Sequence, residues 1–221
     1  RKIPEDRRGR SVGEIMNQVL VLFAHPRPDR SEVNVVLADA ARAVDGVTVV
    51  DLYAEYPTFE IDVEREQRRL LGHDVIVFQH PVYWYSSPAV LKEWQDLVLE
   101  YGFAYGTDGT SLEGKVLLNA VTAGAGRDVY TRDGGYSHEL RDFFVPFEQT
   151  AKLCRMRYLP PFALFAAGHA VDEDRLDDHR RDYTALLEAL VDDRLDLDRA
   201  EDQATLSDSL DSLMTAPAEV Q

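Results

Sequence analysis

The chain of 221 residues contains one cysteine and no long apolar run. With no second cysteine to pair with Cys154, an intrachain disulfide framework and a zinc cluster built on cysteines are both excluded, and a reducing compartment is favoured. No apolar run approaches the roughly 18 to 20 residues that cross a bilayer, so we expect a water-soluble protein. Together with the reducing compartment, this gives a cytoplasmic location as the expectation. Cys154 has no evident activating base, and we interpret it as a core residue.

Positive charge is also scarce, because 24 Lys and Arg stand against 40 Asp and Glu and give a net charge of -16. Nucleic-acid backbones are held by clusters of Lys and Arg, so a nucleic-acid partner is disfavoured. Residues 172–221 alone carry a net charge of -11. The six histidines show no metal-ligand spacing, and we expect no metal site.

The composition predicts one domain with extensions. We divide the chain into an N-terminal arm (residues 1–16), one domain (residues 17–192) and an acidic C-terminal tail (residues 193–221). Within the tail, Leu206, Leu210 and Leu213 have the spacing of one weak helix.

Buried-strand patterns alternate with helical patterns through the domain. The expected strands are 19–24, 47–52, 74–78, 115–121 and a fifth strand region within 153–166, and the expected helices are 33–44, 62–71, 88–101, 137–151 and 172–191. This alternation predicts a doubly wound α/β fold with a five-stranded parallel sheet in the order 2-1-3-4-5. Such sheets bind ligands beyond the carboxyl ends of the strands that flank the switch point, here the first and third strands.

The loop after the third strand contains three consecutive aromatic residues, Tyr83, Trp84 and Tyr85. Flat side chains at the switch point suit a planar ligand. The alternative is that they cap the core or form a subunit interface.

The other two loops near the switch point offer polar groups and glycines. The loop after the first strand has neither a GxGxxG fingerprint nor a P-loop. Ser31 and Asn34 lie in this loop where a helix begins, so they suit either a phosphate site or an ordinary N-cap. The loop after the fourth strand contains Gly124 and then Tyr130 and Tyr136. A phenol beside a ring that gains electrons can donate a hydrogen bond to it; the alternative is that both tyrosines only close the loop by packing.

These motifs together resemble the NAD(P)H:quinone oxidoreductase family, whose fold is flavodoxin-like. The resemblance lies in the spacing of His25, Ser31 and Asn34, followed by QHPVYWYSSPAVLKEWQD, by TAGAGRDVY and by Gly135-Tyr136. It covers about residues 17 to 190. The bacterial members, including the ancillary oxidoreductase subunit of glutathione-regulated potassium-efflux systems, are the most similar.

The resemblance implies a non-covalent flavin with its phosphate at Ser31 to Asn34 and its ring between Pro81 to Tyr85 and Thr122 to Ala125. Tyr136 stands where the mammalian quinone reductases have a histidine, so the Tyr–His proton relay of those enzymes does not carry over to this chain. Ala125 stands where the same enzymes have the second glycine of this loop. The expected cofactor-binding residues are His25, Ser31, Val33, Asn34, Pro81, Val82, Tyr83, Trp84, Tyr85, Thr122, Ala123, Gly124, Ala125 and Tyr130, and the expected catalytic residues are Tyr130 and Tyr136.

The activity that the resemblance implies is two-electron, ping-pong hydride transfer from NADPH or NADH through the flavin to a quinone. FMN is the expected flavin and FAD the alternative, and a homodimer with two interface sites is expected. One alternative function is a regulatory subunit with little turnover, bound to a potassium-efflux transporter at the inner face of the membrane. The other is an azo- or nitroreductase. An electron-transfer flavodoxin is disfavoured, because the aromatic loop (Tyr83 to Tyr85) and the loop that contains Tyr130 and Tyr136 suit a substrate-binding slot.

Overall fold

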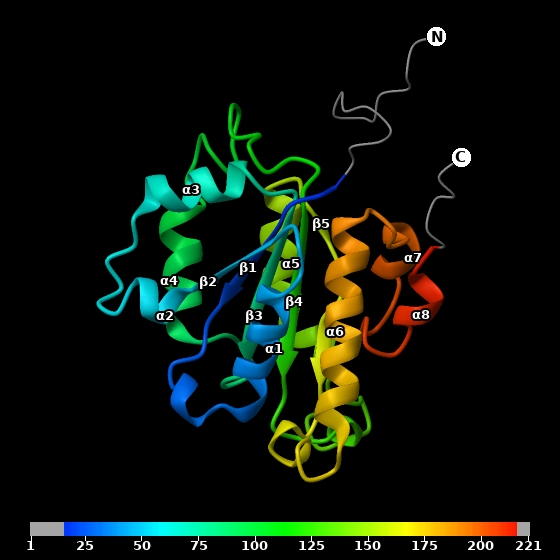
Figure 1. Ribbon diagram of the computed structural model, residues 1–221. Helices are drawn as coiled ribbons and strands as arrows, with labels where there is room; N and C mark the ends of the chain where they lie inside the picture. Colours follow the sequence, from blue (N-terminus) through cyan, green and yellow to red (C-terminus); the bar gives the residue numbers. More distant parts are fainter. Residues whose placement is uncertain (1–15, 216–221) are drawn as a thin grey trace.

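The computed structural model describes residues 16–215, and its centre is a parallel sheet (Figure 1). Residues 1–15 of the expected N-terminal arm and residues 216–221 of the tail lie outside the described part. The strands are β1 (Val19–Phe23), β2 (Val47–Asp51), β3 (Val75–Pro81), β4 (Val116–Thr122), β5 (Arg157–Tyr158) and β6 (Phe162–Leu164). Their order is β2-β1-β3-β4-β5, with β6 also paired to β4, which confirms the expected doubly wound topology.

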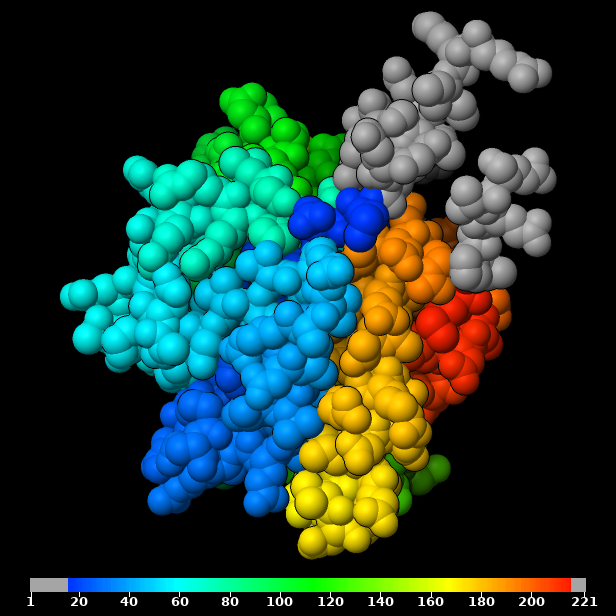
Figure 2. Space-filling view, viewed as in Figure 1, coloured from blue at the N-terminus to red at the C-terminus, as the bar shows by residue number. Residues whose placement is uncertain are grey.

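Helices cover both faces of the sheet. They are α1 (Glu32–Arg42), α2 (Leu52–Glu55), α3 (Val63–Leu71), α4 (Ala89–Val98), α5 (Val145–Leu153), α6 (Arg175–Val191), α7 (Leu197–Glu201) and α8 (Leu210–Leu213). Helices α1 and α6 pack side by side on one face, as Figure 2 also shows, while α2 to α5 cover the other. No helix in residues 16–215 is long and apolar enough to cross a membrane.

Alternate residues of the central strands point to opposite faces and build two hydrophobic clusters. In β3, Ile76 and Phe78 belong to the cluster under α2 to α5, whereas Val75 and Val77 belong to the cluster under α1 and α6. Strands buried on both faces read as continuous apolar runs, which is the reason that the sequence pattern locates them.

Three local expectations are wrong in detail. The fifth strand region is two short strands, because Pro160 and Pro161 cannot donate to the sheet between them. The helix expected over 137–151 begins only at α5, after a 3-10 turn over Leu140–Phe144. The spacing of Leu97 with the apolar residues Val90, Leu91, Trp94 and Val98 also predicts that it is buried on one face of α4, yet Leu97 is exposed.

The acidic segment after α6 folds back onto the domain. Its leucines 195, 206, 210 and 213 are buried in the same cluster as α1 and α6. The single weak helix expected here is wrong, because α8 contains only Leu210 and Leu213, while the amide of Leu206 donates to the carbonyl of Pro161 beside β6.

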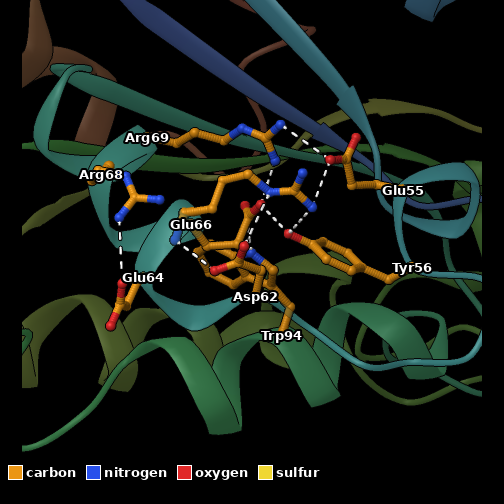
Figure 3. A network of polar contacts seen from close by, with 9 residues as sticks. Glu55, Tyr56, Asp62, Glu64, Glu66, Arg68, Arg69 and Trp94 are labelled. Atoms are coloured by element: carbon orange, nitrogen blue, oxygen red, sulfur yellow. Dashed lines mark hydrogen bonds and ion pairs between the residues drawn. The ribbon is translucent and has the colours of Figure 1, made fainter.

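A buried carboxylate joins α3 to α4 and to the residue after α2 (Figure 3). The side chain of Glu66 is 0% exposed. Its Oε1 accepts from the Tyr56 hydroxyl at 2.5 Å and from the Arg69 guanidinium, and its Oε2 accepts from the indole N–H of Trp94 at 3.0 Å. Burial and the bond to Glu66 raise the pKa of Tyr56 to about 12, so its hydroxyl stays a donor. The network fixes the helix that follows the aromatic loop.

Candidate functional site

An open cavity of about 290 Å³ lies at the carboxyl ends of β1, β3 and β4, at the lower edge of the sheet in Figure 1. This is the switch point of the sheet, because β1 pairs with both β2 and β3. Its walls come from the loop after β1, the start of α1, the ends of β3 and β4, and the segment after β6. The lining residues are His25, Arg30, Ser31, Glu32, Val33, Asn34, Pro81, Val82, Tyr83, Thr122, Ala123, Gly124, Ala167 and Gly168.

The structure brings ten of the expected site residues together around this cavity. They are His25, Ser31, Val33, Asn34, Pro81, Val82, Tyr83, Thr122, Ala123 and Gly124. Trp84, Tyr85, Ala125, Tyr130 and Tyr136 are not among its lining residues.

Sequence reasoning missed Arg30, Glu32, Ala167 and Gly168. Arg30 carries a signal that could have been used, since it is a cation immediately before an N-cap. Ala167 and Gly168 follow the fifth strand region, whose carboxyl end also faces the ligand edge of a parallel sheet.

The start of α1 suits an anion. Ser31 is the N-cap, and its Oγ accepts from the amide of Asn34 at 3.1 Å. The amides of Glu32 and Val33 belong to the first turn and have no acceptor inside the helix. Arg30 lines the cavity and has no ion-pair partner within the described residues. The helix dipole, two first-turn amides and a guanidinium therefore converge on this end of the cavity.

Asn34 lines the cavity and also joins two of its walls. Its Nδ2 donates to the Thr122 hydroxyl at 2.9 Å, and its backbone carbonyl accepts from Nε2 of Gln79 at 2.9 Å. Gln79 in turn accepts from the Tyr183 hydroxyl at 3.1 Å. The Asn34 side chain is buried and joins α1 to the end of β4, so it supports the wall of the cavity.

His25 lies at the carboxyl end of β1 and is buried. Its Nδ1 accepts from the amide of Arg27 at 3.1 Å, which leaves Nε2 as the protonated nitrogen of a neutral ring. Burial lowers the pKa of His25, which favours this neutral form. The ring meets Tyr83 edge to face at 6.1 Å.

The aromatic loop forms a tight turn from Tyr83 to Ser86. The two residues exchange backbone hydrogen bonds of 3.0 Å in both directions. Trp84 and Tyr85 between them have φ values of 49° and 62°, a left-handed conformation that costs energy for bulky residues. The turn leaves the Trp84 side chain 93% exposed. Backbone strain of this kind is concentrated at active sites, ligand clamps and switch regions.

Two glycines leave room in the cavity walls. A Cβ added to Gly124 or to Gly168 would meet no atom within 4 Å. Both residues line the cavity, after β4 and after β6 respectively, so the side chains that they lack would project into open space. A flat ligand could approach the backbone closely here.

Tyr130 and Tyr136 lie beside the cavity in an aromatic cluster that joins the loop after β3 to the loop after β4. Their ring centroids are 5.0 Å apart, and Tyr136 meets Tyr85 at 5.4 Å. Phe143 stacks on Tyr85 at 5.2 Å. Burial, and then the neighbouring phenols, raise the pKa of Tyr130, so its hydroxyl keeps its proton at neutral pH.

A second series of buried hydrogen bonds runs from Tyr158 to Pro81, just before the aromatic loop. The Tyr158 hydroxyl donates to Oδ1 of Asn119 at 3.0 Å, and Nδ2 of Asn119 lies 3.1 Å from Nε2 of His80. Nδ1 of His80 lies 2.9 Å from the carbonyl of Pro81, which lines the cavity. Burial lowers the pKa of His80 to about 4, so the ring is neutral and joins a donor to an acceptor.

The chain matches known proteins over most of its length. The flavodoxin-like fold family matches residues 17–187. The glutathione-regulated potassium-efflux system ancillary protein KefG of Pectobacterium carotovorum is 45% identical over 166 residues, which are 75% of this chain and 90% of that protein. The structure of general stress protein 14 from Treponema denticola, solved in complex with FMN, is 41% identical with a TM-score of 0.74 over 78% of this chain and 99% of that one. An NADPH-quinone reductase from P. pentosaceus is 30% identical with a TM-score of 0.70, covering 77% of this chain and 97% of that one. The chain therefore belongs to the flavodoxin-like fold family.

Proposed function

We propose that this chain is a flavoprotein oxidoreductase that passes two electrons from NAD(P)H to a quinone-like acceptor through bound FMN. The observation that carries the proposal is the cavity at the switch point, with an anion-binding helix end on one side and a glycine-lined wall on the other. The similarity to a protein solved with FMN and to an NADPH-quinone reductase supports it.

The residues of the cavity fit FMN. The phosphate would be held by the first turn of α1 and by Arg30. The ring would lie between Tyr83 on the aromatic loop and the backbone around Gly124. We propose FMN over FAD because general stress protein 14 from Treponema denticola, which this chain resembles, was solved in complex with FMN. When bound, FMN supplies the redox chemistry, accepting a hydride from NAD(P)H and passing it to the acceptor.

The protein orients the reactants and places protons. The paired strands β3 and β4 fix the two walls, since the amide of Val82 donates to the carbonyl of Thr122 at 2.8 Å. His25 holds a proton on Nε2 at one wall of the cavity. Tyr130, kept protonated by burial, holds a donor beside it, and we assign Tyr130 and Tyr136 to stabilising the charge that develops at the acceptor.

The first test is the visible absorption spectrum of the purified protein, followed by NADPH and NADH oxidation with and without a simple quinone. We expect a yellow protein that releases FMN on denaturation and turns over with quinone. Gly124→Leu should weaken FMN binding at least tenfold, because its side chain enters the cavity, while Gly72→Leu, on an exposed helix end, should not. A colourless protein that neither FMN nor FAD reconstitutes would refute the proposal.

A second function is favoured by the similarity to KefG, named as an ancillary protein of a potassium-efflux system. In this alternative the chain binds a membrane transporter from the cytoplasmic side and turns over slowly. Co-expression with a transporter of that class decides between the two. Potassium efflux that depends on the protein and survives Tyr130→Phe would favour the regulatory function.

We also propose a homodimer in the cytoplasm. Trp84 is 93% exposed beside Tyr83 and Tyr85, which are 41% and 45% exposed, and a second copy is the partner that would cover this aromatic turn. Trp84→Ser should shift the protein toward the monomer in sedimentation equilibrium, whereas Tyr101→Ser, exposed elsewhere, should not. An unchanged association constant would contradict this interface. Cell fractionation tests the location.

A further inference from the structure

The C-terminal segment, residues 194–215, lies outside the family match, which ends at residue 187. It nevertheless contacts both ends of the tyrosine loop, which we define as residues 127–144. This loop carries Tyr130, Tyr136 and Phe143 of the aromatic cluster beside the cavity.

Arg127 is the first contact. Its guanidinium pairs with Oδ2 of Asp208 at 2.5 Å and lies 4.3 Å above the ring of Phe165. Phe165 packs edge to face on Tyr130 at 5.5 Å. Asp208 is held in turn by the Thr205 hydroxyl, which donates to the same carboxylate oxygen at 2.7 Å. The C-terminal segment thus reaches Tyr130 through two intermediate side chains.

Arg141 is the second contact, at the other end of the loop. Its Nη1 donates to the backbone carbonyls of Glu201 and Gln203, at 2.8 Å and 2.7 Å. Two residues later, Phe143 packs on both Tyr85 and Tyr130. The C-terminal segment therefore contacts the loop on both sides of Tyr130 and Tyr136.

The C-terminal segment is itself fixed to the sheet and can serve as an anchor. The Ser207 hydroxyl accepts from the amide of Ala163 at 2.6 Å and donates to the carbonyl of the same residue at 2.9 Å, so it pairs with the edge strand β6. Arg157 of β5 pairs with Asp198 and Glu201, both at 2.6 Å. Leucines on the inner side of the segment are buried in the core.

The tyrosine loop has little regular structure of its own. Between its two 3-10 turns, its backbone bonds include those from the amides of Tyr136 to Val129 at 3.1 Å and of Gly134 to Thr131 at 3.0 Å. Its other local bonds are those of turns and of exposed ion pairs, such as Arg132 with Glu139 at 3.6 Å and with Asp142 at 3.9 Å. Because the loop contains no strand or α-helix, its position also depends on contacts with other segments.

We propose that the C-terminal segment positions the tyrosine loop, with Asp208 as the main positioning residue and Arg141 as the second tie. The segment thereby sets the place of Tyr130 and Tyr136 when the acceptor binds. This role rests on the proposed function, because it concerns the acceptor step, but the anchoring itself can be measured without turnover.

The test uses the full chain with Asp208→Asn, Arg127→Gln, the double variant, and Asp198→Asn as a matched control. Asp198 lies on the same segment and forms an ion pair, but its partner is Arg157 of β5 and not the loop. Amide hydrogen exchange over residues 128–138, FMN affinity, and kcat and KM for a simple quinone are measured for each.

We expect faster amide exchange in the loop and a KM for quinone raised about threefold in Asp208→Asn and Arg127→Gln, the size that a half-exposed ion pair supports. The double variant should be no worse than Arg127→Gln alone, because that change already removes the ion pair with Asp208 together with the contact to Phe165. FMN affinity should stay within twofold, and Asp198→Asn should match the parent protein.

Unchanged loop exchange in Asp208→Asn, or single effects that add in the double variant, would overturn the proposal. So would an equal change in Asp198→Asn, which would mean a general loss of stability. If the parent protein reduces no quinone, the proposed function fails, while the exchange measurement still decides whether the segment anchors the loop.

Discussion

Replacing Glu66 by Gln keeps the shape of the side chain but removes one of two acceptor oxygens. In the folded protein Oε2 accepts from the indole of Trp94, and Oε1 accepts from Tyr56 and Arg69. A glutamine amide can be turned in two ways. In one orientation the amide NH2 faces the indole N–H of Trp94, and in the other orientation it faces the guanidinium of Arg69. Neither the indole N–H nor the guanidinium can accept a hydrogen bond. Each orientation therefore leaves a donor without an acceptor.

The cost follows from the burial of the group. Hydrogen bonds to a charged partner contribute about 1.5–3 kcal/mol, and a buried orphan donor costs about 1–3 kcal/mol. Relief of the carboxylate's desolvation offsets part of this loss. We expect a net loss of about 3 kcal/mol in the free energy of unfolding, and a melting temperature lower by about 2–4 °C for each kcal/mol in a chain of this size.

Urea unfolding followed by circular dichroism measures the difference, and Glu64→Gln is the control. Glu64 lies on the same helix, but its side chain is 88% exposed and 3.6 Å from Arg68, so its loss should cost below about 0.5 kcal/mol. If the two variants differ by under about 1 kcal/mol, the hydrogen bonds of Glu66 do not stabilise the packing of α3 against α4.

Three further changes test other parts of the structure. Burial lowers the pKa values of His80 and His179 to about 4, below their ordinary value of 6.5. The unfolded chain therefore binds more protons as the pH falls from 6.5 toward 4, and each histidine should cost up to about 1.4 kcal/mol of stability per pH unit in that window. His179→Gln should flatten the decline in urea midpoint between pH 7 and pH 5, and an equal slope would contradict the burial argument. Ser31→Ala should cost about 1 kcal/mol, measured by the same midpoints, because it removes the N-cap of α1; no loss would mean that water replaces the cap. Tyr130→Phe should lower kcat for quinone about tenfold with FMN affinity unchanged, since it removes a hydrogen-bond donor beside the acceptor, and full activity would remove Tyr130 from the proposed mechanism.

The sequence alone determined the order of the elements and the position of the ligand edge. Strands such as β1 and β3 are buried on both faces, so they appear as continuous apolar runs, and their spacing around helical patterns leaves few topologies. That topology brings the loops after β1, β3 and β4 to one edge. Ten of the expected residues line one cavity for this reason.

Tertiary structure alone decided which side chains face the cavity and which support it. The φ values of Trp84 and Tyr85 turn one aromatic ring to the solvent and the other toward Tyr136, and no sequence pattern encodes this. Pairings between distant segments are equally hidden, such as Asn34 with Thr122 or Arg127 with Asp208. Periodicity reports which face of an element is buried, but the partner of a buried polar group depends on how the elements pack. The acidic segment over residues 194–215 shows the same limit, because its many charged side chains indicate an exposed segment while its few leucines are buried in the core.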